Sequence, residues 1–124
     1  MWGLAYKQEA NWDSAIEKLA MAVKINRVDP YAWHMYAFCQ SMLDQYSAAD
    51  RAYRSALQAI GDRNPRQKKL TLVAMAQNLL KAGGNLAAIQ AIVDEARGLP
   101  GSGTSWRRVT RELEERRREM PGTT

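Results

Sequence analysis

The residues with chemical reactivity in this sequence are few, and their spacing does not build a catalytic site. His34 is the only histidine and Cys39 the only cysteine. They are five residues apart, which on a helix puts them about 140° apart around the axis, so they do not form a base and nucleophile pair. Gly83, Gly84 and Asn85 make a glycine-rich turn but lack the Lys-Ser/Thr of a phosphate loop. We therefore expect no catalytic residues, no cofactor and no enzyme activity.

Metal binding and disulfide formation are not indicated either. A single cysteine cannot form an internal disulfide, and no Cys/His spacing of the metal-binding kind occurs. We expect Cys39 to be a small buried residue on a helix. The carboxylates lie among basic residues at helical spacing, which is typical of a solvated helix face.

The composition describes an ordinary globular chain of one domain. It has 124 residues, of which 46% are hydrophobic and 25% charged, with a net charge of +5. No apolar run approaches membrane-spanning length, and no secretory signal follows Met1. We expect a reduced, cytoplasmic setting and no membrane span.

The elements that position these residues are predicted to be helices throughout. Ala, Leu, Arg and Gln are plentiful, and no stretch alternates as a strand would. Asp29 and Pro30 begin a helix over 31–43, and Gly61 closes a second helix over 46–60. The other expected signals are Asn11 as an N-cap, a turn at 44–45, Asn64-Pro65 as a helix start and Gly83-Gly84-Asn85 as a turn and cap.

The sequence repeats itself with a period of 34 residues. Asn11–Val23 and Gln45–Leu57 carry small residues opposite small ones and large opposite large. Two antiparallel helices in each period would make a helical hairpin, repeated and stacked. A poorer third copy is shifted by 40 residues. The matched pairs are Trp2/Tyr36, Gly3/Ala37, Trp12/Tyr46, Ala15/Ala49, Leu19/Tyr53, Ala22/Ala56 and Val23/Leu57, and for the third copy Tyr46/Leu86, Ala49/Ile89, Tyr53/Val93 and Ala56/Ala96.

This pattern resembles the tetratricopeptide repeat (TPR) family. The second unit carries its signature best, with Trp33, Tyr36, Ala37, Tyr46, Ala49, Tyr53 and Ala56. The second unit departs from the family pattern at Gln40, where an aromatic residue is usual. The proline that usually closes a repeat is absent from both of the first two units, where Arg27 and Gly61 stand in its place. The resemblance implies an all-α solenoid of about three repeats over 1–98, at approximately 1–29, 30–63 and 64–98.

A last helix is expected to follow the array. Residues 99–104 read as a linker because they are rich in glycine and proline. Over 105–120, Trp106, Val109, Leu113 and Met120 fall on one stripe, and arginines and glutamates fill the other faces. We expect this helix to cap the exposed end of the array.

The resemblance also implies a concave groove lined by the first helix of each repeat. Helical spacing alone puts Tyr31, His34, Phe38 and Met42 on one face. Whether Phe38 and Met42 line a groove or pack in the core is left open by the sequence. The implied groove residues are Leu4, Lys7, Gln8, Tyr31, His34, Phe38, Ser41, Met42, Asn78 and Lys81, with Thr71 and Ala74 at the matching places of the third unit.

We therefore expect a noncatalytic protein–protein interaction scaffold that binds an extended or helical peptide. The carboxylate clamp of some TPR proteins is absent, because Met35, Thr71 and Met75 occupy its places. Residues 37–56 also resemble the middle repeat of the chaperones that hold type III secretion translocators, although those are usually acidic. That chaperone function is an alternative.

A second alternative is an RNA-binding helical repeat. Basic residues gather at Arg63, Arg66, Lys68, Lys69 and the run 116–118. Glutamates interrupt the terminal run and offer i,i+4 ion pairs, so we expect a protein partner rather than a nucleic acid. The incomplete first repeat, with Trp2 exposed, would offer a surface for self-association.

Overall fold

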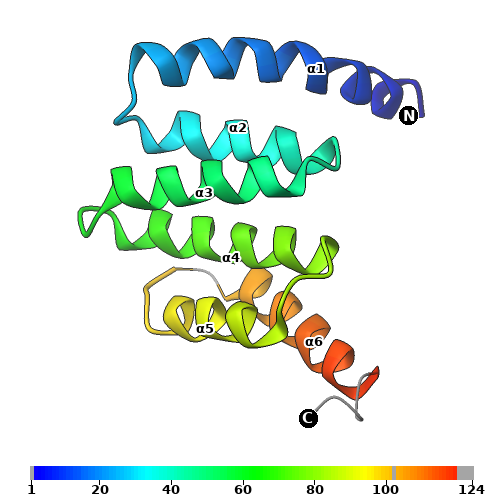
Figure 1. The fold of residues 1–124 in the computed structure, drawn as a ribbon, viewed down its shortest axis with the longest axis vertical. Coiled ribbons are helices and arrows are strands. Elements are labelled where there is room, and N and C mark those ends of the chain that lie inside the picture. The colour runs from blue at the N-terminus through cyan, green and yellow to red at the C-terminus, as the bar shows by residue number, and fades with distance from the viewer. Residues whose placement is uncertain (1, 102, 120–124) are drawn as a thin grey trace. The chain divides into compact units, whose positions relative to one another are not determined.

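The structure is a computed structural model that describes residues 2–101 and 103–119, with the side chains of 12–101, 103 and 106–119. Over these residues the chain forms six helices and no strand, which confirms the all-α prediction (Figure 1). A break in the packing after Gly61 divides the chain into two compact units, called here the first and second unit. The helices are α1 (Trp2–Ile25), α2 (Pro30–Met42) and α3 (Tyr46–Ile60) in the first unit, and α4 (Pro65–Lys81), α5 (Leu86–Arg97) and α6 (Thr104–Glu119) in the second.

The boundaries of α2 and α3 follow from local capping. Asp29 precedes Pro30, and its Oδ1 accepts hydrogen bonds from the backbone N–H of Tyr31 at 3.1 Å and of Ala32 at 3.4 Å. Gly61 ends α3 with φ of 56°, a left-handed conformation that side chains with a Cβ rarely adopt. Both signals were predicted, and α2 begins and ends one residue earlier than expected.

Two asparagines begin the helices of the second unit, as predicted. The Asn64 side chain accepts a hydrogen bond from the backbone N–H of Gln67 at 3.2 Å. Asn85 accepts two, from Ala87 at 2.8 Å and from Ala88 at 3.2 Å. These bonds satisfy backbone donors that a helix leaves unpaired at its N-terminus.

The first helix differs from the prediction. Asn11 does not begin a second helix, because α1 runs without interruption over 24 residues from Trp2 to Ile25. The physical reason is local: residues 4–23 contain neither glycine nor proline, so nothing breaks the helix where a hairpin turn was expected. The first unit therefore holds one long helix in place of the expected first hairpin.

The core of the first unit places alanines where helices meet. Figure 1 shows α2 and α3 running antiparallel, with α1 packed on α2. Ala37, Ala49 and Ala56 are fully buried, and Tyr53 is the largest of the fully buried side chains. This agrees with the expectation that small residues permit close crossings and a large residue fills the space beside them.

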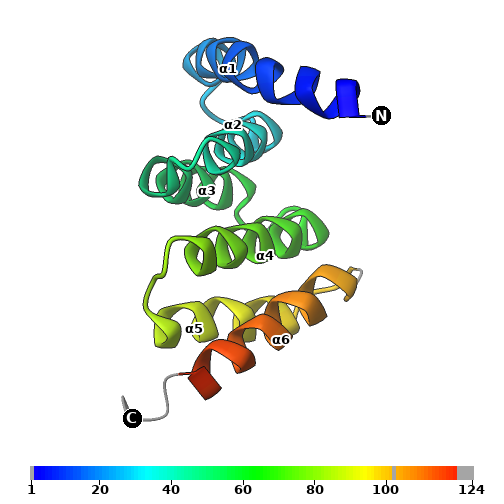
Figure 2. The same cartoon turned by 90° about the vertical axis from the view of Figure 1, so that its right-hand side faces the viewer.

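The second unit is a helix pair with a third helix laid against it (Figure 2). Ile89, Val93 and Ala96, the predicted counterparts of Ala49, Tyr53 and Ala56, are all buried. From α6, the side chains of Val109 and Leu113 are buried at 2% and 1% exposure. The predicted apolar stripe of α6 therefore packs on α4 and α5. Met120, its expected fourth member, lies outside the described residues.

Polar contacts fix α6 in the second unit. The indole Nε1–H of Trp106 donates to the Val93 carbonyl at 2.9 Å, and the Arg97 guanidinium lies 5.3 Å from the Trp106 ring centroid. Arg116 donates from Nη1 to the Leu80 carbonyl at 3.1 Å, near the C-terminus of α4. The Leu80 carbonyl also accepts a hydrogen bond from the backbone N–H of Gly83 at 3.2 Å, so Arg116 adds a second bond at this helix end.

Candidate peptide-binding surface

The candidate surface is the face of α2 that the sequence identified, and it is partly open. Tyr31 is 65% exposed, Phe38 38% and Met42 41%. These residues follow one another at i, i+7 and i+11, so they lie along one side of the helix. We call these three side chains the α2 apolar face. Ser41, also a predicted groove residue, is buried at 6% exposure.

Phe38 is shared between this face and the helix packing. Its ring meets the ring of Trp12 from α1 edge to face, with centroids 5.6 Å apart. The sequence left open whether Phe38 lines a groove or packs in the core. In the structure it does both in part, because it contacts a neighbouring helix and is still 38% exposed. Tyr31 and Met42 carry more of the exposed area.

His34, which helical spacing puts on the same side of α2, is half-buried. Its ring stands edge to face against the Tyr53 ring of α3, with centroids 5.5 Å apart. Burial lowers the pKa of His34 from its ordinary value of 6.5, so the imidazole is neutral near pH 7. Burial also raises the pKa of the Cys39 thiol, and that residue is 1% exposed. A buried thiol held in its neutral form is a poor nucleophile.

The other predicted groove residues either have side chains outside the described ones or lie in the second unit. The side chains of Leu4, Lys7, Gln8 and Trp2 lie outside those that the structure describes. Asn78 and Lys81 are in the second unit, where Asn78 is buried at 1% exposure and Lys81 is exposed. Thr71 is also buried, and Ala74 half-buried.

Several basic residues proposed as nucleic-acid contacts have structural partners instead. Lys69 is 8% exposed and donates from Nζ to the Leu99 carbonyl at 3.2 Å. Lys68 reaches Glu95 at 3.6 Å and Asp62 at 3.8 Å. Arg116 binds the Leu80 carbonyl, as described above. Sequence reasoning missed these roles because Leu99, Glu95 and Leu80 come from distant parts of the chain.

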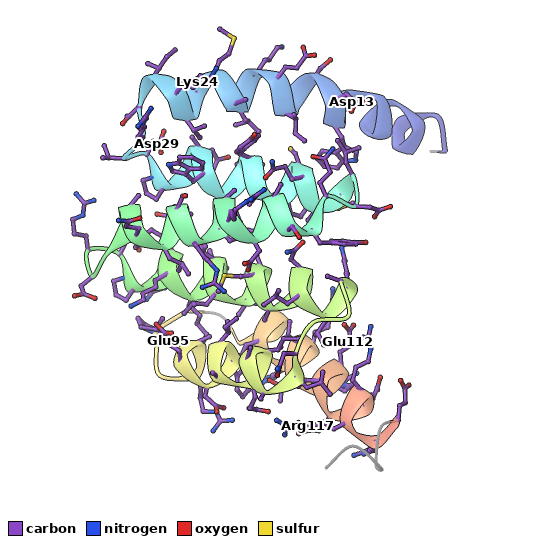
Figure 3. The ribbon with its side chains drawn as sticks, in the orientation of Figure 1. Asp13, Lys24, Asp29, Glu95, Glu112 and Arg117 are labelled. Carbon is purple, nitrogen blue, oxygen red and sulfur yellow. The ribbon has the colours of Figure 1, made fainter. Side chains whose placement is uncertain are left out.

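The ion pairs expected along α6 are not formed. Among side chains 106–119, no arginine lies within ion-pair distance of a glutamate. Glu112 and Arg117, labelled in Figure 3, project from the helix without meeting each other. Arg116 donates to the Leu80 carbonyl at the end of α4 instead.

One concave site in the first unit was not predicted. A pocket of about 340 Å³ lies between the turn that joins α1 to α2 and the C-terminal part of α3. Its lining residues are Arg27, Val28, Trp33, Ser55, Gln58 and Ala59. The signal that could have revealed it is Val28, a large apolar residue in a turn. We call this the turn pocket.

Two other features are absent from the described residues. No group of three or more His, Cys, Asp or Glu side chains there could hold a metal ion. None of the helices in that same part of the chain is both long and apolar enough to cross a membrane. No protein-family model, curated protein or solved structure matches the chain.

Proposed function

We propose that this chain is a noncatalytic interaction module that binds a partner peptide on the α2 apolar face. The observation that carries the proposal is the exposure of Tyr31, Phe38 and Met42 on a helix whose other residues are buried or half-buried. Large apolar side chains that remain exposed along one side of a helix are more typical of a binding surface than of an ordinary water-exposed surface. Methionine and aromatic side chains suit this use, because they offer large contact area and adapt to a partner.

The resemblance to the TPR family supports the same proposal. The signature alanines of the second predicted repeat are fully buried and its Tyr53 fills the space beside them. The matching residues of the third copy are buried in the same way. In a TPR solenoid the first helix of each hairpin lines the groove, and α2 holds that place in the second predicted repeat. We therefore propose a TPR-like array in which α6 covers the C-terminal end.

The test is binding of a peptide selected from a displayed random library against the purified chain. We expect Tyr31→Ala and Met42→Ala each to lower the affinity for that peptide by about tenfold, because each removes exposed apolar contact area. Isothermal titration would measure the dissociation constants. These two variants are preferable to Phe38→Ala, since Phe38 also packs on Trp12 and its loss would alter the fold.

A matched control is Met21→Ala, which removes a methionine that is 64% exposed on α1. It should leave the affinity unchanged. The proposal is wrong if Met21→Ala lowers the affinity for the peptide as much as Met42→Ala does. It is also wrong if neither α2 variant changes the affinity for any selected peptide.

A second candidate, nucleic-acid binding, is favoured by one observation. Residues 62–119 hold twelve Lys and Arg against seven Asp and Glu, so the second unit carries the entire net charge of +5. Arg107, Arg108 and Arg111 are exposed and have no carboxylate partner among the described side chains. The structural roles of Lys69 and Arg116 weigh against it. Retention on immobilised duplex RNA that falls steeply with salt would favour this candidate.

A further inference from the structure

We propose that the turn pocket is a second binding site, which takes an apolar side chain of a peptide whose neighbouring residue is acidic. The pocket lies within the first unit and is separate from the α2 apolar face. Trp33, which lines it, is five residues before Phe38 and therefore about 140° away around α2. The inference thus goes beyond the proposed function and does not depend on it.

The size and lining of the pocket fit one side chain and its flanking backbone. Its volume of about 340 Å³ is near the lower end of the range for ligand pockets, roughly 300 to 1,000 Å³, so a large cofactor would not fit. Trp33, Val28 and Ala59 supply an apolar wall. The Trp33 indole is fixed in place, because its Nε1–H donates to the Arg27 carbonyl at 2.8 Å. The wall is therefore formed before a ligand arrives.

The charge at the pocket indicates an acidic ligand. The Arg27 side chain lines the pocket, is exposed, and forms no ion pair with any carboxylate among the described side chains. Arg51 is exposed on α3, one helical turn before Ser55, and likewise has no carboxylate partner among them. The nearest acidic residue in the turn, Asp29, uses its Oδ1 to cap α2 (labelled in Figure 3). An arginine left open at the edge of an apolar pocket can bind a carboxylate with good geometry.

The surroundings favour a peptide over a small molecule. Val28 is 68% exposed, and Ile25, three residues before it at the end of α1, is 83% exposed. A small acid that filled the pocket would contact Val28 but would leave Ile25, which does not line the pocket, in water. A peptide extends beyond the pocket and could cover Ile25 as well, so that this exposed apolar side chain is also removed from water.

The experiment follows the indole signal of Trp33 by nuclear magnetic resonance while a peptide is added. The chain has four tryptophans, and the Trp33 signal is assigned from its loss in Trp33→Phe. The probe is an acetylated and amidated nine-residue peptide with one leucine between two aspartates. We expect a saturable shift of this signal, which Ala59→Phe abolishes by filling the pocket. Arg27→Gln should weaken binding by about threefold to fivefold, the range for a partly exposed ion pair.

Four comparisons make the result decisive. Lys18→Gln removes the same charge from an exposed position on α1 and should leave the affinity unchanged. A peptide with lysines in place of the aspartates, or glycine in place of the leucine, should bind at least about fivefold more weakly. N-acetylleucine should bind more weakly than the peptide. Equal binding by N-acetylleucine would assign the pocket to small acids, and no saturable shift, or equal losses in Lys18→Gln and Arg27→Gln, would overturn the proposal.

Discussion

His34 is a residue whose environment makes the stability of this chain depend on pH. Its ring packs against Tyr53, and burial lowers its pKa below the ordinary value of 6.5. Between the lowered pKa and about 6.5 the unfolded chain therefore binds more protons at this site than the folded chain does. The contribution of neutral His34 to stability is complete above pH 6.5 and is lost as the pH falls from 6.5 through the lowered pKa.

This reasoning predicts that His34→Gln flattens part of the pH profile. Urea unfolding at pH 7.5 and pH 5.0 should show a larger loss of unfolding free energy for the wild type than for the variant. The carboxylates titrate in both proteins, so their effect cancels in the difference, and no other histidine is present. Equal losses in the two proteins would mean that His34 titrates normally in the folded state.

At the scale of single elements, the capping asparagine of α5 offers the cleanest test. Asn85 Oδ1 accepts two backbone hydrogen bonds, at 2.8 and 3.2 Å. Asn85→Ala leaves both donors without this acceptor and should cost about 1 kcal/mol of unfolding free energy. Asn85→Asp keeps the acceptor and should cost little, because a carboxylate is favourable at a helix N-terminus. Urea denaturation measures both, and equal costs would show that the cap bonds do not contribute.

The elements were predictable where the sequence carries a local stop or start signal. Asp29, Gly61 and Asn85 act within a few residues of themselves, so reading them needed no knowledge of the fold. The error came at Asn11, where the 34-residue repeat suggested a hairpin that no glycine or proline supports. Helix propensity kept that segment in one continuous helix.

The candidate site was predictable only in part, for a related reason. The face of α2 follows from the 3.6-residue period, which fixes that Tyr31, Phe38 and Met42 share a side. The edge-to-face contact of Phe38 with Trp12 depends on how α1 packs, and the period does not contain that information. The turn pocket is formed by α2, α3 and a turn together. It could therefore not be predicted from any one stretch of sequence, and the exposed Val28 was only a hint.

At the scale of the whole molecule, the division after Gly61 has a consequence for folding. The second unit has its own core, in which α6 covers apolar residues of α4 and α5. The most buried large apolar side chains of this core are Leu72, Leu80, Ile89, Val93, Val109 and Leu113. A chain of about 60 residues can fold alone, although it buries only about 60% of its surface and is marginally stable.

We therefore predict that residues 62–124 expressed alone keep a helical circular dichroism spectrum and unfold cooperatively in urea, at a lower midpoint than the full chain. The matched control is residues 62–103, which lack α6. Its loss should expose the apolar surface that Val109 and Leu113 now cover, so this shorter chain should be largely unfolded. If the two pieces are equally helical and equally stable, α6 does not act as a cap. If residues 62–124 are themselves unfolded, the second unit depends on the first for its stability.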